Sequence, residues 1–71
     1  MYAELVFPLP FRNTFTYSVP EVLKPLVQPG VRAVAPFGKR TLTGFIVAVS
    51  TSTDVKENIK PLDDILDTKP I

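Results

Sequence analysis

The chain has 71 residues and a formal net charge of +1, and it contains neither cysteine nor histidine. A chain of this length forms one small domain, which buries only about 60% of the surface of its unfolded state. The missing side chains exclude disulfide bonds and the usual zinc ligand sets, and no apolar run approaches the ~18 residues of a membrane-spanning helix. We therefore expect a single soluble, cytoplasmic domain over residues 1–71 without a metal or redox role.

Charge is distributed unevenly along the chain. Residues 1–53 carry five basic and two acidic side chains, whereas residues 54–71 carry three basic and five acidic ones. The excess of positive charge in residues 1–53 is too small for sequence-independent coating of duplex DNA, which depends on many phosphate contacts. It fits either a small site for one or a few nucleotides or cations that only solvate the surface.

In chain order, the first predicted elements are two strands and a short helical turn. In residues 2–7, Ala3, Leu5 and Phe7 alternate with Tyr2, Glu4 and Val6, as in a strand with two different faces. A proline-rich segment follows and ends strand pairing. Residues 14–19 alternate more clearly and predict a half-buried strand. Residues 20–24 can form one helical turn, which Pro25 is expected to end because it keeps the preceding residue out of the helical region.

A β-hairpin is predicted in the middle of the chain. A Pro-Gly pair at positions 29–30 suits the centre of a type II turn. Two β-rich runs follow over residues 31–35 and 41–50, and Gly44 interrupts the second run, where a bend or bulge is expected. The turn between them holds Gly38 and two cations, which offers an anion such as phosphate both close backbone approach and positive charge.

The remaining segment and the overall fold class follow from the same reasoning. Residues 59–66 predict a short last strand, because the nearby prolines leave little room for a helix. Several short strands with proline and glycine turns are typical of a mainly β fold. We expect a small, partly open β-barrel of OB-like or SH3-like shape with at most one short helical turn.

The sequence argues against a catalytic role. Gly38 and Lys39 resemble part of a phosphate-binding loop, but the upstream glycine and the following helix are missing. Asp63, Asp64 and Asp67 lie in an acidic region without a candidate base, nucleophile or metal partner, which is typical of a solvated surface. Without histidine or an activated lysine, no nucleophilic triad can be assembled. The fragment is therefore not expected to be an enzyme or to need a cofactor.

Seven aromatic rings are the most suggestive feature of the composition. In a domain this small, most of them must belong to the core. Phe15 and Phe37 are the best candidates for an exposed role, because small hydroxyl residues flank Phe15 and Phe37 adjoins Gly38 and Lys39. A ring beside a cation allows a small barrel to stack a base while holding its phosphate.

Several segments, in their order and spacing, resemble a known family. These are the opening strand with Phe-Pro-Leu-Pro at 7–10, Asn-Thr-Phe-Thr-Tyr-Ser-Val-Pro at 13–20, the Pro-Gly turn through Pro-Phe-Gly-Lys-Arg at 29–40, Gly-Phe-Ile-Val at 44–47, and residues 59–67. Together they resemble the N-terminal 3′-end DNA-binding domain of the bacterial primosomal protein N′, the PriA replication-restart DNA helicase. The resemblance covers essentially all 71 residues.

This resemblance implies a module that binds the 3′ end of the nascent leading strand at a stalled replication fork, with little sequence preference. The full-length protein would be an ATP-dependent 3′-to-5′ DNA helicase of the bacterial cytoplasm that uses ATP, magnesium and zinc. Its partners would be single-stranded or forked DNA with a 3′ end, other primosome proteins and the single-stranded DNA-binding protein.

The resemblance also implies which residues bind the DNA end. The implied 3′-end site consists of Phe15, Thr16, Gly38 and Lys60, while Lys39 and Arg40 would steer the DNA backbone. Phe15 would form an apolar wall, Gly38 would allow close backbone approach, and Lys60 would pair with a phosphate or a base edge. Alternatively, Lys60 is a solvent-exposed lysine that faces Asp63 or Asp64.

Thr16 departs from the family pattern, in which the run reads Thr-Phe-Asp-Tyr. A neutral hydroxyl here replaces a carboxylate that can accept a hydrogen bond from a 3′-hydroxyl. A charged acceptor is the stronger one, so the substitution is expected to weaken discrimination for a free 3′-hydroxyl by roughly 1 kcal/mol.

Two other functions fit the residues. The first is a protein-interaction barrel that docks a partner through the Phe37 tip and an exposed sheet edge. The second is a small RNA-binding barrel, which would prefer RNA and depend on its 2′-hydroxyl groups.

Overall fold

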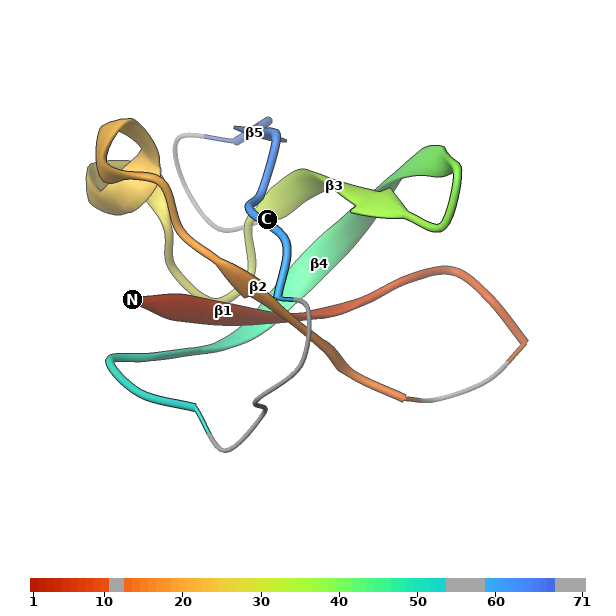
Figure 1. Ribbon diagram of the computed structural model, residues 1–71, viewed down its shortest axis with the longest axis horizontal. Coiled ribbons are helices and arrows are strands. Elements are labelled where there is room, and N and C mark those ends of the chain that lie inside the picture. Colours follow the sequence, from red (N-terminus) through yellow and green to blue (C-terminus); the bar gives the residue numbers. More distant parts are fainter. Residues whose placement is uncertain (11–12, 54–58, 68–71) are drawn as a thin grey trace.

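The computed structural model describes residues 1–10, 13–53 and 59–67, which form one five-stranded sheet and one short 3₁₀ helix. The elements are β1 (Tyr2–Val6), β2 (Phe15–Ser18), η1 (Glu21–Leu26), β3 (Arg32–Phe37), β4 (Arg40–Ser50) and β5 (Asp64–Ile65). The strand order is β2-β1-β4-β3-β5, and all neighbouring strands are antiparallel (Figure 1). The predicted mainly β fold is confirmed.

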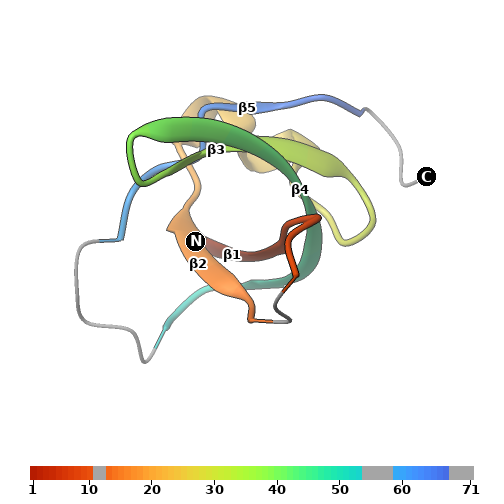
Figure 2. The same ribbon diagram turned by 90° about the vertical axis from the view of Figure 1, so that its right-hand side faces the viewer.

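The sheet curls into a partly open barrel, as the view along the strands shows (Figure 2). Its edge strands β2 and β5 do not pair with each other, so the sheet is not closed. The chain before β5 partly bridges the gap. On the β2 side, the amide of Ser18 donates to the Lys60 carbonyl and the amide of Leu62 donates to the Ser18 carbonyl, both at 3.0 Å. On the β3 side, the amide of Asp63 donates to the Val34 carbonyl at 2.8 Å.

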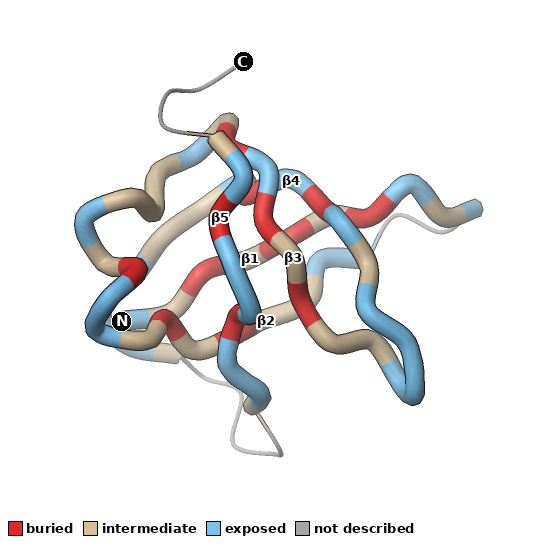
Figure 3. The backbone as a smooth tube through the Cα atoms, turned by 90° about the horizontal axis from the view of Figure 1, so that it is seen from above, coloured by how far each residue is buried: buried red, intermediate tan, exposed pale blue. Residues whose placement is uncertain are grey.

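The core forms because buried and exposed residues alternate along the strands (Figure 3). In β1, Ala3 and Leu5 are fully buried while their neighbours are partly exposed, which is the period of two expected of a half-buried strand. Burying a Leu or Ile side chain stabilises the fold by roughly 1.5–3 kcal/mol. The buried core consists of Ala3, Leu5, Phe7, Tyr17, Val19, Leu23, Val31, Ala33, Ala35, Ile46, Leu62 and Ile65.

Strand β4 contains a bulge, but not at Gly44, where a bend or bulge was predicted. The register between β1 and β4 shifts between Glu4 and Leu5, and the extra residue on β4 is Val47. This is a β-bulge, which bends the strand locally and increases its twist. The predicted bulge at Gly44 was therefore wrong in position, since the observed one lies three residues later.

Gly44 is glycine because β1 and the residue after it pack directly on β4 at this point. A Cβ built at position 44 would lie 2.6 Å from the carbonyl oxygen of Val6 and 2.7 Å from the nearest ring carbon of Phe7. Neither distance is compatible with a side chain. The ring of Phe7 thus occupies the space that any larger residue at position 44 would need.

The 3₁₀ helix η1 is longer than predicted. The helical turn was expected to stop at Lys24, but η1 continues through Pro25. On one side the amide of Leu23 donates to the Pro20 carbonyl at 2.9 Å, and on the other the amide of Val27 donates to the Lys24 carbonyl at 3.4 Å. Neither of these bonds involves the nitrogen of Pro25, which has no hydrogen to donate.

The predicted turn at residues 28–31 and a last strand are present. The amide of Val31 donates to the Gln28 carbonyl at 3.4 Å and Gly30 has a φ of 95°, as a type II turn requires. The short last strand is β5, which covers only Asp64–Ile65 of the predicted residues 59–66. One of the seven aromatic residues, Phe11, lies outside the described residues. Among the helices of the described chain, none has the length and apolar character to cross a membrane.

Candidate functional site

The tip of the β3–β4 hairpin forms the first wall of the candidate site. Phe37 pairs with Arg40, so Gly38 and Lys39 make up a two-residue turn. Gly38 has a φ of 64°, a left-handed conformation that primed hairpin turns require and that favours glycine. A Cβ built at Gly38 meets no heavy atom within 4 Å, so the space beside this backbone is open to a ligand.

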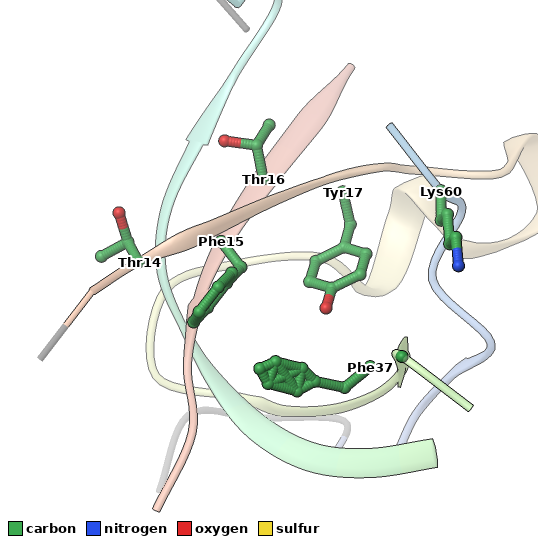
Figure 4. A pocket seen from close by; sticks show the side chains of 7 residues that line it. Thr14, Phe15, Thr16, Tyr17, Phe37 and Lys60 are labelled. Carbon is green, nitrogen blue, oxygen red and sulfur yellow. The ribbon is translucent and has the colours of Figure 1, made fainter. Parts of the chain in front are cut away.

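Strand β2 forms the second wall. Its alternation places Phe15 and Tyr17 on the same side, and Figure 4 shows both side chains pointing towards Phe37. The hydroxyl of Tyr17 donates a hydrogen bond of 2.8 Å to the Pro36 carbonyl, which ties β2 to the end of β3. Burial raises the pKa of Tyr17, so its phenol stays protonated and remains a donor at neutral pH.

Three phenylalanine rings connect the two walls. The rings of Phe7 and Phe37 stack with centroids 5.3 Å apart and an interplanar angle of 10°. The ring of Phe15 is tilted against both, with centroids 5.0 Å from Phe37 and 5.8 Å from Phe7. Phe7 is buried, whereas Phe15 and Phe37 are partly exposed. We call these three rings the aromatic cluster.

The walls enclose an open pocket of about 400 Å³ (Figure 4). We call it the first pocket, and it is lined by Thr14, Phe15, Thr16, Tyr17, Phe37, Gly38 and Lys60. The structure therefore brings the four residues of the predicted 3′-end site together in one pocket, although they come from three separate parts of the chain. Their binding role stays a prediction.

Sequence reasoning missed two of the lining residues, Thr14 and Tyr17. The signal for Tyr17 was present in the sequence, because strand alternation puts it on the same face as Phe15. Phe37 was singled out as a ring beside a cation but was not assigned to the site. It lies at the end of β3 and belongs to the aromatic cluster, so it is not an isolated ring at the hairpin tip.

Lys60 reaches the first pocket from the chain just before β5. The hydrogen bond from the Ser18 amide to the Lys60 carbonyl fixes the Lys60 backbone beside β2. The residue is exposed and, within the described part of the chain, forms no ion pair with Asp63 or Asp64. Lys60 is thus solvent-exposed, as the alternative expects, and its side chain also lines the first pocket.

Thr16 differs in orientation from its neighbours on β2. Figure 4 shows its side chain pointing away from Phe37. Its hydroxyl donates a long hydrogen bond of 3.4 Å to Oε1 of Glu4, the residue directly opposite it on β1. Thr16 therefore lies at the rim of the first pocket with a carboxylate beside it, and sequence reasoning did not single out Glu4.

The two cations of the hairpin tip do not line the first pocket. Arg40 instead lines a second pocket, of which Phe37 and Gly38 are also members. Lys39 is exposed and lines neither of these two pockets. The predicted role of Lys39 and Arg40 in steering a DNA backbone stays a prediction.

Comparison with known proteins identifies similar sequences. Residues 4–71 match the family model of the 3′ DNA-binding domain (3′BD) of PriA. The chain is 32% identical over 74 residues to the replication restart protein PriA of Bacillus subtilis (strain 168), a match that covers 99% of the chain and 9% of that protein. It is 40% identical over 52 residues to the replication restart protein PriA of Treponema pallidum (strain Nichols), covering 73% of the chain and 8% of that protein. The chain thus spans less than a tenth of the length of both relatives.

Proposed function

Because this chain belongs to the family of PriA 3′ DNA-binding domains, we propose that its first pocket holds the 3′-terminal nucleotide of a DNA strand. The observation that carries the proposal is the assembly of Phe15, Thr16, Gly38 and Lys60 around one pocket. These residues come from β2, the hairpin tip and the chain before β5, so only the folded domain brings them together.

The pocket offers a nucleotide three kinds of contact. The partly exposed rings of Phe15 and Phe37 present apolar surface to a base or a sugar. The ammonium group of Lys60 pairs with a phosphate or with a base edge. The open space beside Gly38 lets the ligand approach the backbone closely. Every nucleotide shares these features, so the site binds with little sequence preference.

Membership of the family supports a proposal for the wider role. We propose that the chain is the N-terminal module of an ATP-dependent replication-restart helicase that acts from 3′ to 5′, and that it binds the 3′ end of the nascent leading strand at stalled forks. ATP, magnesium and zinc, like the contacts with other primosome proteins and with the single-stranded DNA-binding protein, belong to the remaining nine-tenths or so of a protein the size of the B. subtilis relative.

Fluorescence anisotropy of labelled single-stranded oligonucleotides tests the proposal. The ligands end in a free 3′-hydroxyl, a 3′-phosphate or a blocked junction. We expect the free 3′-hydroxyl to bind most tightly, and competition with matched RNA to be weaker. Equal, negligible binding of all three ends would contradict the proposal, and a preference for RNA would favour an RNA-binding barrel.

Lys60→Ala is the cleanest variant for this measurement, because Lys60 is exposed and its backbone hydrogen bond to Ser18 is retained. Loss of a charged hydrogen bond is expected to weaken binding about tenfold, with no change in the thermal unfolding midpoint. Lys39→Ala is the matched control, since it removes the same charge outside the first pocket. Phe15→Ala is less informative, because Phe15 also packs against the core.

A further inference from the structure

A second pocket adjoins the first at the hairpin tip. It has a volume of about 430 Å³ and is lined by Leu9, Phe37, Gly38, Arg40 and Leu42. Phe37 and Gly38 line both pockets. The two pockets are therefore neighbours that meet at Phe37 and Gly38.

In the described part of the chain, the walls of the second pocket combine apolar surface with one cation. Leu9 and Leu42 are partly buried and pack against the core, which holds them in place. The amide of Leu9 also donates to the Phe7 carbonyl at 2.7 Å. Among the described residues, no acidic side chain lines this pocket. The lining thus suits a ligand that has a flat, weakly polar part and a negative charge nearby.

Arg40 is the cation of this pocket. It is exposed and, among the described residues, forms no ion pair, in contrast to Arg32, which is paired with Asp67 at 3.0 Å. Its guanidinium group is consequently available to a ligand. A guanidinium fork matches the geometry of phosphate oxygens, so the combination with apolar walls fits a nucleotide.

Gly38 lies at the boundary between the two pockets, because it lines both of them. Because a Cβ built there meets nothing within 4 Å, the backbone at this point stands beside open space. No side chain of residue 38 blocks the passage from one pocket to the other. Residue 38 itself therefore presents no side chain to a phosphodiester that links nucleotides in the two pockets.

We propose that the second pocket holds the penultimate nucleotide of the bound strand, the one on the 5′ side of the 3′-terminal nucleotide. Its base lies against Leu9, Leu42 and Phe37, and a backbone phosphate lies within reach of Arg40. The inference rests on the proposed function of the first pocket. The inference assigns Arg40 a specific contact with a phosphate, whereas Lys39 has no such contact in either pocket.

Three short ligands, each with a free 3′-hydroxyl, test this inference. They are a deoxynucleoside 5′-monophosphate, a 5′-phosphorylated dinucleotide whose 5′ residue is abasic, and the complete 5′-phosphorylated dinucleotide. The two dinucleotides carry the same charge, so a difference between them reports the penultimate base alone. We expect the complete dinucleotide to bind about tenfold more tightly than the abasic one, which is near the lower end of the contribution of a stacked base.

Three variants separate the contacts. Leu42→Ala is expected to reduce the difference between the two dinucleotides severalfold. Arg40→Ala is expected to weaken both dinucleotides more than the mononucleotide, whereas the control Lys39→Ala weakens all three ligands alike. Thermal unfolding shows whether each variant is folded. The comparison of the three ligands on the unchanged chain tests the second site even if a variant does not fold.

The outcomes distinguish the two sites. Binding of the mononucleotide with equal affinities for the abasic and complete dinucleotides overturns the second site and leaves the first intact. Identical effects of Arg40→Ala and Lys39→Ala on every ligand also overturn it, because they indicate unspecific attraction of charge. Failure of all three ligands to bind overturns the proposed function itself and this inference with it.

Discussion

Phe15 and Phe37 belong both to the aromatic cluster and to the lining of the first pocket. A chain of 71 residues has a small core, which needs most of the aromatic side chains for its packing. The residues that shape the pocket therefore also stabilise the fold. Lys60 is different, because it is exposed and its side chain contributes to the pocket alone.

Thr16→Asp tests the arrangement at the rim of the first pocket. The new carboxylate would stand directly opposite that of Glu4 on β1. Like charges in this position are destabilising, so the free energy of unfolding is expected to fall by about 0.2–1 kcal/mol at neutral pH. Urea denaturation measures the change, and adding Glu4→Gln is expected to reverse it.

The double variant also tests the selectivity of the site. With Glu4→Gln present, the aspartate at position 16 is expected to raise the preference for a free 3′-hydroxyl over a 3′-phosphate about fivefold, since a charged acceptor adds ~1 kcal/mol. Unchanged selectivity would show that residue 16 does not contact the 3′-hydroxyl. Equal stability of the chains with and without Glu4→Gln would contradict the pairing with Glu4.

At the scale of the elements, the β3–β4 hairpin contributes to both pockets, and local sequence signals predict it. The Pro-Gly turn and the two β-rich runs are short-range features, and they lead to β3 and β4 within a few residues of their ends. The contact between Gly44 and Phe7 depends on how β1 packs against β4. Residues distant in the sequence determine it, so the sequence suggested a bulge at Gly44 where the structure has a close contact.

Two glycine variants separate packing from backbone conformation. Gly44→Ala is expected to destabilise the fold by about 1–3 kcal/mol or more, because its Cβ would overlap the Val6 carbonyl and the Phe7 ring. Gly38→Ala has open space and is expected to lose only roughly 1–2 kcal/mol from its positive φ. Denaturant titration measures both. A Gly44→Ala chain as stable as the unchanged one would contradict the packing of β1 on β4.

At the scale of the whole molecule, the first pocket depends on how the chain before and after β5 fills the gap in the barrel. Arg32 holds the end of this segment. Its amide and Nε donate to Oδ2 of Asp67 at 2.9 and 3.1 Å, and Nη2 donates to Oδ1 at 3.0 Å. This two-point pairing fastens the residue two positions after β5 to the start of β3.

The pairing predicts how stability depends on pH. The hydrogen bonds from Arg32 hold the pKa of Asp67 below its ordinary value. A carboxyl group whose pKa is lower in the folded state stabilises the fold above its ordinary pKa and loses this effect as the pH falls through the lowered value. Urea denaturation is therefore expected to show declining stability below about pH 4.

Substitutions of the two partners test the origin of this decline. Asp67→Asn is expected to lower stability at neutral pH and to flatten the decline in acid. In a chain that already carries Arg32→Gln, the same change is expected to have much less effect. An equal effect of Asp67→Asn with and without Arg32 would rule out the pair as the cause.

The candidate site is the part of the molecule that could least be predicted from the sequence alone. The family resemblance nominates Phe15, Thr16, Gly38 and Lys60, but only the folded chain shows that they share a pocket. The place of Lys60 depends on hydrogen bonds to Ser18, and the contact of Thr16 depends on the register of β1 and β2. Long-range pairings of this kind leave no local pattern in a single sequence.

Nuclear magnetic resonance of the isotope-labelled chain tests the central claim most directly. The chain is titrated with a short linear single-stranded DNA that has a free 3′-hydroxyl, and separately with a circular DNA of the same composition that has no end. We predict that the amide resonances of Phe15, Gly38 and Lys60 shift with the linear DNA and not with the circular one. Equal shifts of these resonances with both DNAs would contradict recognition of a 3′ end.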